Sequence, residues 1–350
     1  MNKKTVLRFI AVMIIGLLLV PSKVSGAAAK SGKWGSNLKW SFSGGVLTIS
    51  GKGDMDAKAF VGASKSSDPR NLAITKVVIK EGVTSVCDNA FSYQKKLKKV
   101  TLPSSIKAVG REAFNGCRKL TTVNFPKNIE TIGGFAFAET ALKKVKLPEK
   151  LKTLKYNAFS DCTGLKTVTF NKKLEKIESA AFMNTAIKAV RLPASLTEIA
   201  ASALSGCPAL GTIKVDPGNK SYLVNNGILF SKDKTRLILY PAKKKGNTYT
   251  VPKNIAVIEN CAFIDAVSIR SFEVEKGNKN YTSENGVIFS PDMKKLVKYP
   301  AAAGTAEYTV PESVTEIGTN ALYNSMAEKV TLPSGLITVG TGAFKNSKKL

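Results

Sequence analysis

Short alternations of apolar and polar residues recur along this chain at an almost constant interval. In the copy that begins at Leu97, the run from Lys99 to Leu102 alternates outward and inward, as in a strand with one buried face. Pro103 ends this strand because it has no N–H to donate. Successive copies begin 23, 22, 23 and 22 residues apart, at Leu97, Leu120, Leu142, Leu165 and Ile187. A fixed period in the range of about 20 to 50 residues predicts a solenoid, a stack of similar turns.

Three apolar positions repeat inside every copy and predict three continuous columns through the stack. The positions eight and five residues before the first column hold only Val, Ile or Leu. A single turn cannot bury its own apolar face, whereas stacked turns bury the faces of their neighbours. The first column consists of Phe91, Phe114, Phe137, Phe159, Phe182, Leu204, Phe263, Leu322 and Phe344.

The motif LP-x-x-[IL]-x-x-[IV]-x-x-x-AF, carried by these copies, resembles the BspA-like branch of leucine-rich repeats over roughly residues 34 to 350. The resemblance implies a β-rich solenoid: a right-handed stack of 22–23-residue turns with an N-terminal β-hairpin cap, found on secreted and surface proteins of bacteria and some protists. The commoner leucine-rich pattern places Asn or Cys three residues past the last strand Leu, where it caps buried backbone groups. No buried Asn ladder is expected in this chain, because that position holds Ser105, Asn128, Lys150, Lys173 and Ser195.

The N-terminus predicts a secretory signal peptide over residues 1–26. Basic residues precede an apolar run of 12 residues, Phe9 to Val20, and small residues around 26–29 suit cleavage. A membrane anchor would need about 17–25 apolar residues, and the remaining chain contains no transmembrane segment. The protein is therefore expected to be secreted and to act outside the cell or at the cell surface.

The rest of the chain divides into four parts. Residues 27–70 predict the β-hairpin cap, since Leu38 to Gly51 alternates on both sides of a Gly-Gly pair. Capping is the preferred interpretation of Trp34 and Trp40, with ligand stacking as the alternative. Regular repeats fill residues 71–210. Two 59-residue double-turn modules, each with a hairpin such as Gly227 to Tyr240, fill residues 211–327, and the last repeat, 328–350, has no polar closing turn. The total is eleven turns.

The charge is strongly positive. Without the four basic residues of the first 26, the chain has 49 basic and 25 acidic residues, a net charge of +24. Such a field attracts polyanions, among them teichoic acids and acidic glycans of the wall or host. A dedicated nucleic-acid partner is not expected, because the lysines are not interleaved with exposed aromatic residues. The alternative is that the lysines serve solubility alone.

Composition also removes most catalytic chemistry. The chain contains no histidine, which excludes Ser-His and Cys-His nucleophiles and the usual zinc ligand. Cys117, Cys162 and Cys207 recur in alternate repeats, roughly 10 Å apart for strands spaced at about 4.8 Å, too far for a disulfide. No cofactor, metal or disulfide is expected. A hydrolase built on a carboxylate pair remains as an alternative, although the acids are scattered on predicted turns.

The strand residues that point outward form the predicted binding face. Thr, Asn and basic side chains there suit an extended polymer or another protein, or they merely blunt an exposed sheet. The expected function is non-enzymatic adhesion or surface recognition of host or envelope macromolecules, through an extracellular protein or a polyanionic polymer. An envelope-retained structural protein held by charge on wall polyanions is the alternative. The candidate residues are Lys76, Lys99, Thr101, Asn124, Lys144, Lys146, Thr169, Arg191 and Lys214.

Overall fold

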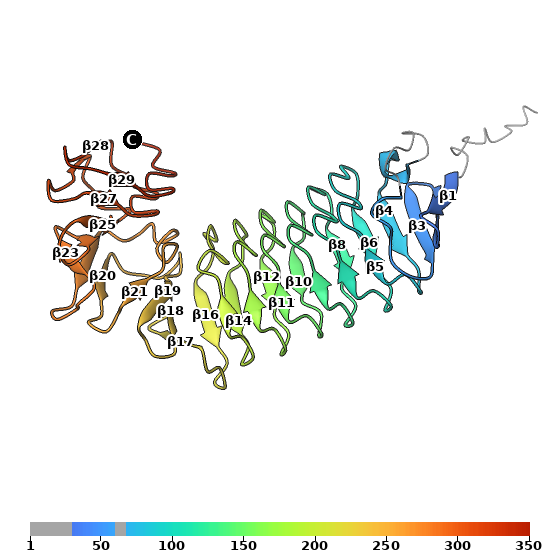
Figure 1. Ribbon diagram of the computed structural model, residues 1–350, viewed down its shortest axis with the longest axis horizontal. Helices are drawn as coiled ribbons and strands as arrows, with labels where there is room; N and C mark the ends of the chain where they lie inside the picture. The colour runs from blue at the N-terminus through green and yellow to red at the C-terminus, as the bar shows by residue number, and fades with distance from the viewer. Residues whose placement is uncertain (1–29, 60–67) are drawn as a thin grey trace, which may run out of the picture.

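The computed structural model describes residues 30–59 and 68–350, which form one long β-solenoid (Figure 1). The expected signal peptide, residues 1–26, lies outside the described residues. The single helical element within the described ranges is a one-turn 3-10 helix, η1 (Pro69–Asn71), whose first turn is capped by the Asp68 carboxylate. We call each turn of the solenoid a rung.

Each rung contributes one strand to a front sheet and a shorter strand to a second sheet. Eleven front strands are present, which confirms the expected number of turns. The front strands are β4 (Lys76–Ile79), β6 (Lys99–Thr101), β8 (Thr122–Asn124), β10 (Lys144–Lys146), β12 (Thr167–Thr169), β14 (Ala189–Leu192), β16 (Thr212–Val215), β20 (Thr248–Val251), β22 (Ser271–Val274), β26 (Glu307–Thr309) and β28 (Lys329–Thr331). The second-sheet strands are β5 (Ser85–Val86), β7 (Ala108–Val109), β9 (Thr131–Ile132), β11 (Thr153–Leu154), β13 (Lys176–Ile177), β15 (Glu198–Ile199), β21 (Val257–Ile258), β27 (Glu316–Ile317) and β29 (Thr338–Val339).

The three predicted columns form the core. Equivalent valines of neighbouring rungs pair in register, as Val77 with Val100 and Val100 with Val123. The phenylalanine column stacks nearly parallel, with ring centroids 5.2 to 5.6 Å apart from Phe91 to Phe182. These rings are fully buried. The period of the sequence therefore becomes the stacking of the core.

A β-hairpin covers the first rung. Strands β1 (Lys30–Trp34), β2 (Leu38–Ser43) and β3 (Val46–Gly51) are antiparallel, and β3 pairs in parallel with β4. Trp34 is buried, its indole N–H donates to the Asp56 carbonyl at 2.9 Å, and its ring lies 5.8 Å from Phe91. Trp40 is buried as well. Both tryptophans thus close the end of the core, as the capping interpretation requires.

The two double-turn modules contain the expected hairpins and one further strand each. In the first module the predicted hairpin is β18 (Ile228–Ser231) and β19 (Arg236–Leu239), and β17 (Tyr222–Asn225) adds to it across an Asn226-Gly227 turn. Both turn residues have positive φ, which suits a tight hairpin. The second module repeats this arrangement with β23 (Thr282–Glu284), β24 (Val287–Phe289) and β25 (Lys295–Lys298). Beyond β16 the stack bends (Figure 1).

A tyrosine hydroxyl continues the second sheet where each module begins. The Tyr222 hydroxyl accepts the Ile199 N–H at 2.9 Å and donates to the Thr197 carbonyl at 3.1 Å. The Tyr281 hydroxyl accepts the Ile258 N–H at 2.9 Å in the same way. One phenol therefore satisfies backbone groups that the next strand would otherwise pair.

The expectation that no buried Asn would cap the rungs is wrong in three places. The Asn171 amide donates to the Pro148 and Leu151 carbonyls at 2.6 and 2.9 Å. Asn219 and Asn278 make the same pair of bonds at the start of the two modules. Asn171 stands where the other regular rungs have proline, so the capping group enters from a different position than in the commoner repeat.

The turn that leads into the front strand has two lengths, and the shorter one interrupts the front sheet. Five residues separate Phe137 from Leu142 and Phe182 from Ile187, against six in the rungs between them. The front ladder is missing after each short turn, between β8 and β10 and between β12 and β14, whereas β6–β8, β10–β12 and β14–β16 pair in register. One residue fewer removes about 3.3 Å of chain, and the next strand starts out of position.

Candidate binding face

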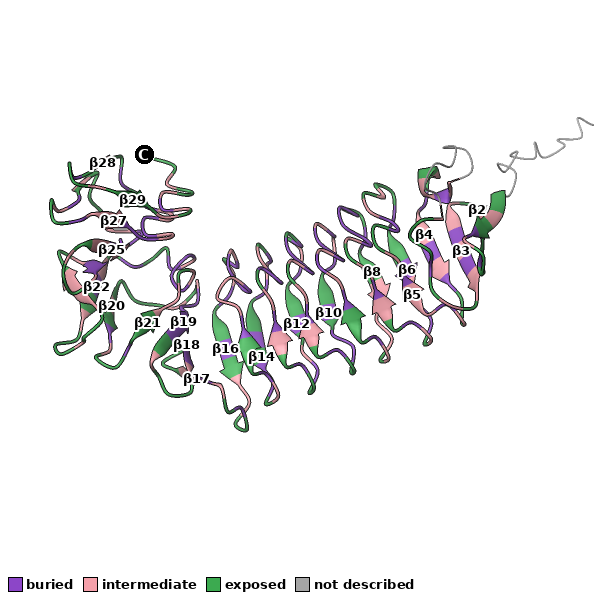
Figure 2. Ribbon diagram, in the orientation of Figure 1, coloured by how far each residue is buried: buried purple, intermediate pink, exposed green. Residues whose placement is uncertain are grey.

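The outward side chains of the seven strands from β4 to β16 form one surface, which we call the front face. All nine residues predicted for binding lie there. Seven of them are exposed, whereas Lys76 and Thr101 are half-buried. Figure 2 shows exposed segments on β10, β14 and β16. The strand alternation thus presents these side chains to solvent, as expected.

Basic side chains on the front face stand directly beside one another. Lys76 pairs in register with Lys99, and Arg191 with Lys214. Neighbouring strands lie about 4.8 Å apart, and like charges placed directly opposite each other destabilise a sheet. The face therefore carries a repulsion that a bound anion would relieve.

Ion pairing separates the two sheets. On the second-sheet side, lysines bridge to glutamates of the next rung: Lys152 to Glu175 at 3.0 Å and Lys176 to Glu198 at 2.8 Å. On the front face, only Arg191 has such a partner, Asp216, at 2.7 Å. Within residues 30–59 and 68–350, no carboxylate lies within 4.0 Å of the ammonium groups of Lys76, Lys99, Lys144, Lys146 or Lys214. The unpaired positive charge is thus concentrated on the front face.

Asn124 contributes less to a ligand than the sequence suggested. Its side-chain oxygen accepts the Leu102 N–H at 2.8 Å, and its amide nitrogen donates to the Leu102 carbonyl at 2.8 Å. The side chain thus extends the ladder beyond the end of β8, and both of its polar atoms have a backbone partner.

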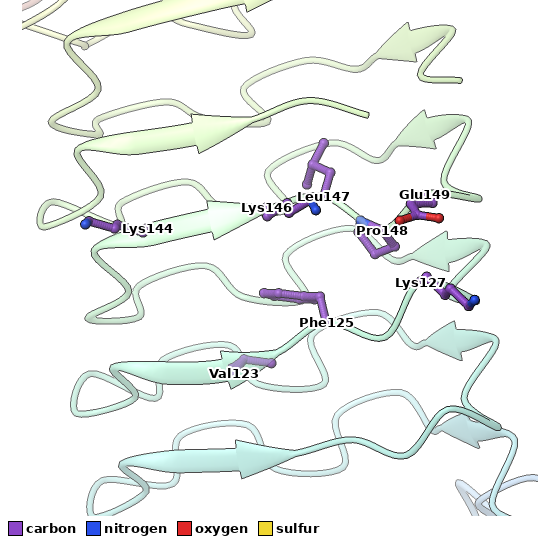
Figure 3. A pocket seen from close by; sticks show the side chains of 8 residues that line it. All are labelled: Val123, Phe125, Lys127, Lys144, Lys146, Leu147, Pro148 and Glu149. Atoms are coloured by element: carbon purple, nitrogen blue, oxygen red, sulfur yellow. The ribbon is translucent and has the colours of Figure 1, made fainter. Parts of the chain in front are cut away.

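Two hollows lie at the ends of the front strands. The first, about 170 Å³, lies between the ends of β8 and β10, where the front ladder is interrupted (Figure 3). The second, about 400 Å³, lies between the ends of β10 and β12. They share Lys146, Leu147 and Glu149. The first is further lined by Val123, Phe125, Lys127, Lys144 and Pro148, and the second by Phe170, Asn171, Lys172 and Lys173.

The comparisons with known proteins agree with this architecture. The family described as BspA type leucine rich repeat region matches residues 84–211 and 302–350, in six copies. The chain belongs to this family. The residues between the two matched ranges are mostly those of the double-turn modules, whose duplication is visible from the chain itself. No curated protein sequence matches the chain.

Solved structures show the same fold. A leucine-rich repeat protein from Eubacterium ventriosum is 22% identical, over 92% of this chain and 84% of its own, with a TM-score of 0.55. A leucine rich cell surface protein from Faecalibacterium prausnitzii is 21% identical, over 87% and 94%, with a TM-score of 0.58. The pneumococcal vaccine antigen PcpA is 22% identical, over 90% and 87%, with a TM-score of 0.59.

Two searches for other kinds of site bear on the function. No cluster of three or more Cys, Asp or Glu residues that could hold a metal ion occurs in the described ranges. No helix in the same ranges is long and apolar enough to cross a membrane.

Sequence reasoning missed the aromatic and basic residues of the two hollows. Phe125 and Phe170 replace the leucine that ends the strand in other rungs, at Leu102, Leu147 and Leu192. Both precede a short turn. The alternation of 23- and 22-residue spacings was the available signal, and its meaning depends on where the sheet opens.

The cysteines have the register expected from the sequence. All five are free. The Thr140 hydroxyl lies 3.2 Å from the Cys162 thiol, and the Thr185 hydroxyl lies 3.3 Å from the Cys207 thiol, so a threonine rung separates successive thiols. Burial raises the pKa of Cys117 to about 12 and that of Cys162 and Cys207 to about 11.

Alkylation should therefore be limited by folding and not by disulfides. At pH 8, without reductant, iodoacetamide should leave Cys117, Cys162 and Cys207 unmodified in the folded protein, because they are buried and protonated. After unfolding in denaturant, intact mass should show all five thiols modified. Two or four unmodified thiols in the unfolded chain would mean that a disulfide exists.

Proposed function

We propose that this chain is a secreted or cell-surface, non-enzymatic binding protein that holds an extracellular anionic polymer on its front face, in adhesion or surface recognition. The observation that carries the proposal is the unpaired row of basic side chains on that face, in a protein that pairs its second-sheet lysines with glutamates. The description of the Faecalibacterium prausnitzii neighbour as a cell surface protein supports the location, as does the predicted signal peptide.

The geometry suits a polymer better than a small molecule. Strands β4 to β16 present charges on an extended sheet, so one ligand can meet several of them in turn. An anion bound beside Lys76 and Lys99 also removes their mutual repulsion. Attraction of this kind weakens as salt is added, because ions screen exposed charges.

An envelope-retained structural role is the second candidate. Exposed lysines also occur away from the front face, as at Lys52, Lys107 and Lys232, and the whole chain carries excess positive charge. In that case wall polyanions would hold the protein by net charge alone, with no preferred surface.

A charge-matched pair of variants separates the two candidates. The front variant replaces Lys99, Lys144, Lys146, Arg191 and Lys214 by Gln. The control variant replaces five exposed lysines outside the front strands: Lys52, Lys107, Lys232, Lys253 and Lys294. A lysine near an anionic surface contributes about 1 kcal/mol, so the front variant should lose at least tenfold in affinity for heparin and elute from a heparin column at lower salt.

The control variant should shift less for the same loss of charge. Equal shifts in elution salt would show that only net charge acts, and the front face would lose its role. Unchanged elution of both variants would exclude charge-held binding altogether.

A further inference from the structure

The two hollows beside Lys146 combine features that the rest of the front face lacks. Each has an aromatic side chain in its wall, Phe125 in the first and Phe170 in the second, and each has lysines at its rim. Glu149 is the one acid that lines both. We propose that they are paired subsites for consecutive sugar rings of a carboxylated polysaccharide, a polyuronate. This proposal rests on the proposed function.

The aromatic walls are held rigidly by the core. The Phe125 ring lies edge-on to Phe137 at 5.1 Å and to Phe159 at 6.2 Å. The Phe170 ring lies 5.8 Å from Phe182. Both phenylalanines are nonetheless half-exposed. A ring fixed on one side and open on the other is a platform that costs little conformational entropy when a ligand packs on it.

The size of the hollows fits sugar rings. At roughly 30 Å³ of liquid volume per water molecule, the first hollow has room for about six waters, which a single pyranose ring can replace. Adjacent rungs lie about 4.8 Å apart, close to the length of one residue in an extended polysaccharide. A chain running along the stack can therefore place neighbouring rings in neighbouring hollows.

The charges fit carboxylates. Lys127, Lys144 and Lys146 line the first hollow, and Lys172 and Lys173 line the second (Figure 3). None of the five has a carboxylate within 4.0 Å among the residues that the structure describes. A uronate ring offers an apolar C–H face to the phenylalanine and a carboxylate to the lysines at its edge.

An acidic peptide fits less well. Extended peptides gain much of their affinity by pairing their backbone with an open sheet edge. Strands β10 and β12 already pair with each other, so between them a peptide would find lysine side chains and no backbone partners. It would also leave the aromatic platforms without an apolar ring to cover them.

The test replaces each phenylalanine by the leucine that other rungs use. The double variant Phe125→Leu/Phe170→Leu keeps every charge, and Tyr156→Leu, an exposed aromatic outside the front face, is the matched control. Three probes are compared at equal salt: polygalacturonate, polyglutamate and polyphosphate. The double variant should bind polygalacturonate about tenfold more weakly, the effect of two lost aromatic contacts, and should bind the other two probes as the wild type does.

The possible outcomes decide between the proposals. No binding of polygalacturonate by the wild type, an equal loss for all three probes, or no loss at all would overturn the subsites. A loss for polyglutamate that matches or exceeds the loss for polygalacturonate would assign the hollows to an acidic peptide instead. Each of these results leaves the front-face proposal intact, because that proposal fails only if the five-residue Gln variant and its charge-matched control behave alike.

A second pair of variants covers loss of folding, which the thermal transition would reveal. Lys127→Gln/Lys172→Gln removes charge from the rims of the hollows, and Lys107→Gln/Lys253→Gln removes the same charge elsewhere. The first pair should weaken polygalacturonate binding at least threefold more than the second. Equal effects would overturn the proposal.

Discussion

Replacing Phe137 by alanine is expected to destabilise the middle of the solenoid by about 3–5 kcal/mol, the range for large aromatic deletions in a core. Phe137 is fully buried. It stacks on Phe114 at 5.2 Å and on Phe159 at 5.5 Å, and Phe125 packs against its edge at 5.1 Å. Rungs on both sides prevent the site from collapsing, so most of the cavity would remain.

Graded substitutions make this prediction specific. Phe137→Leu should cost less, because Leu204 and Leu322 already occupy the same column. Phe344→Ala, at a half-exposed position in the last rung, should cost much less than Phe137→Ala. Urea unfolding followed by circular dichroism measures the order. A loss below about 1 kcal/mol for Phe137→Ala, with the fold retained, would show that the column does not stabilise the stack as its burial implies.

Replacing Lys298 by methionine is expected to stabilise the last rungs at neutral pH. Lys298 is buried, and its ammonium group donates to the Asn320 carbonyl at 2.8 Å. No carboxylate lies within 4.0 Å of it among the described residues, and the Cys261 thiol is the titratable group that acts on it. The first module has Leu239 at the equivalent position, 59 residues earlier.

Burial lowers the pKa of Lys298 from 10.5 to about 7. Between these values the unfolded chain holds a proton that the folded chain lacks. Protonation therefore favours unfolding, and wild-type stability falls as the pH drops from 10.5 to 7. Below pH 7 both states are protonated and the difference stays constant. At about 1.4 kcal/mol per pKa unit the penalty at pH 7 is on the order of 4 kcal/mol, and losing the bond to Asn320 returns about 1 kcal/mol.

The net gain for Lys298→Met at pH 7 is therefore about 3 kcal/mol, shrinking toward zero near pH 10. Hydrogen exchange of β25 and β27 measures it locally, which matters because a repeat array need not unfold as one unit. Lys294→Met, at an exposed neighbouring position, is the control and should change little. A destabilised Lys298→Met protein at pH 7, with the same pH dependence as the wild type, would contradict the burial argument.

Much of this fold could be predicted from the sequence because its information is local and repeated. The alternation in each copy decides which side chains point outward, and the period decides that copies stack. For that reason all nine predicted binding residues lie on the front face. The 59-residue duplication also placed Lys298 opposite a leucine, although the sequence alone did not show that its amine would be buried.

The double-turn modules mark a limit of this reasoning. The hairpin from Gly227 to Tyr240 was expected, yet β17 was not, although Asn226-Gly227 is a strong turn signal. The roles of Tyr222 and Asn219 could not be read from local pattern, because their partners lie in the preceding rung, more than 20 residues away.

The sequence by itself determined the solenoid, its number of rungs, its core columns and the identity of the residues on the front face. Only the tertiary structure decided which lysines have a carboxylate partner, where the front sheet opens and where Phe125 and Phe170 line a hollow. The physical reason is a matter of length. Alternation has a period of two residues and survives small errors in register, whereas an ion pair or a strand ladder depends on the offset between neighbouring rungs, which one residue of turn changes by about 3.3 Å.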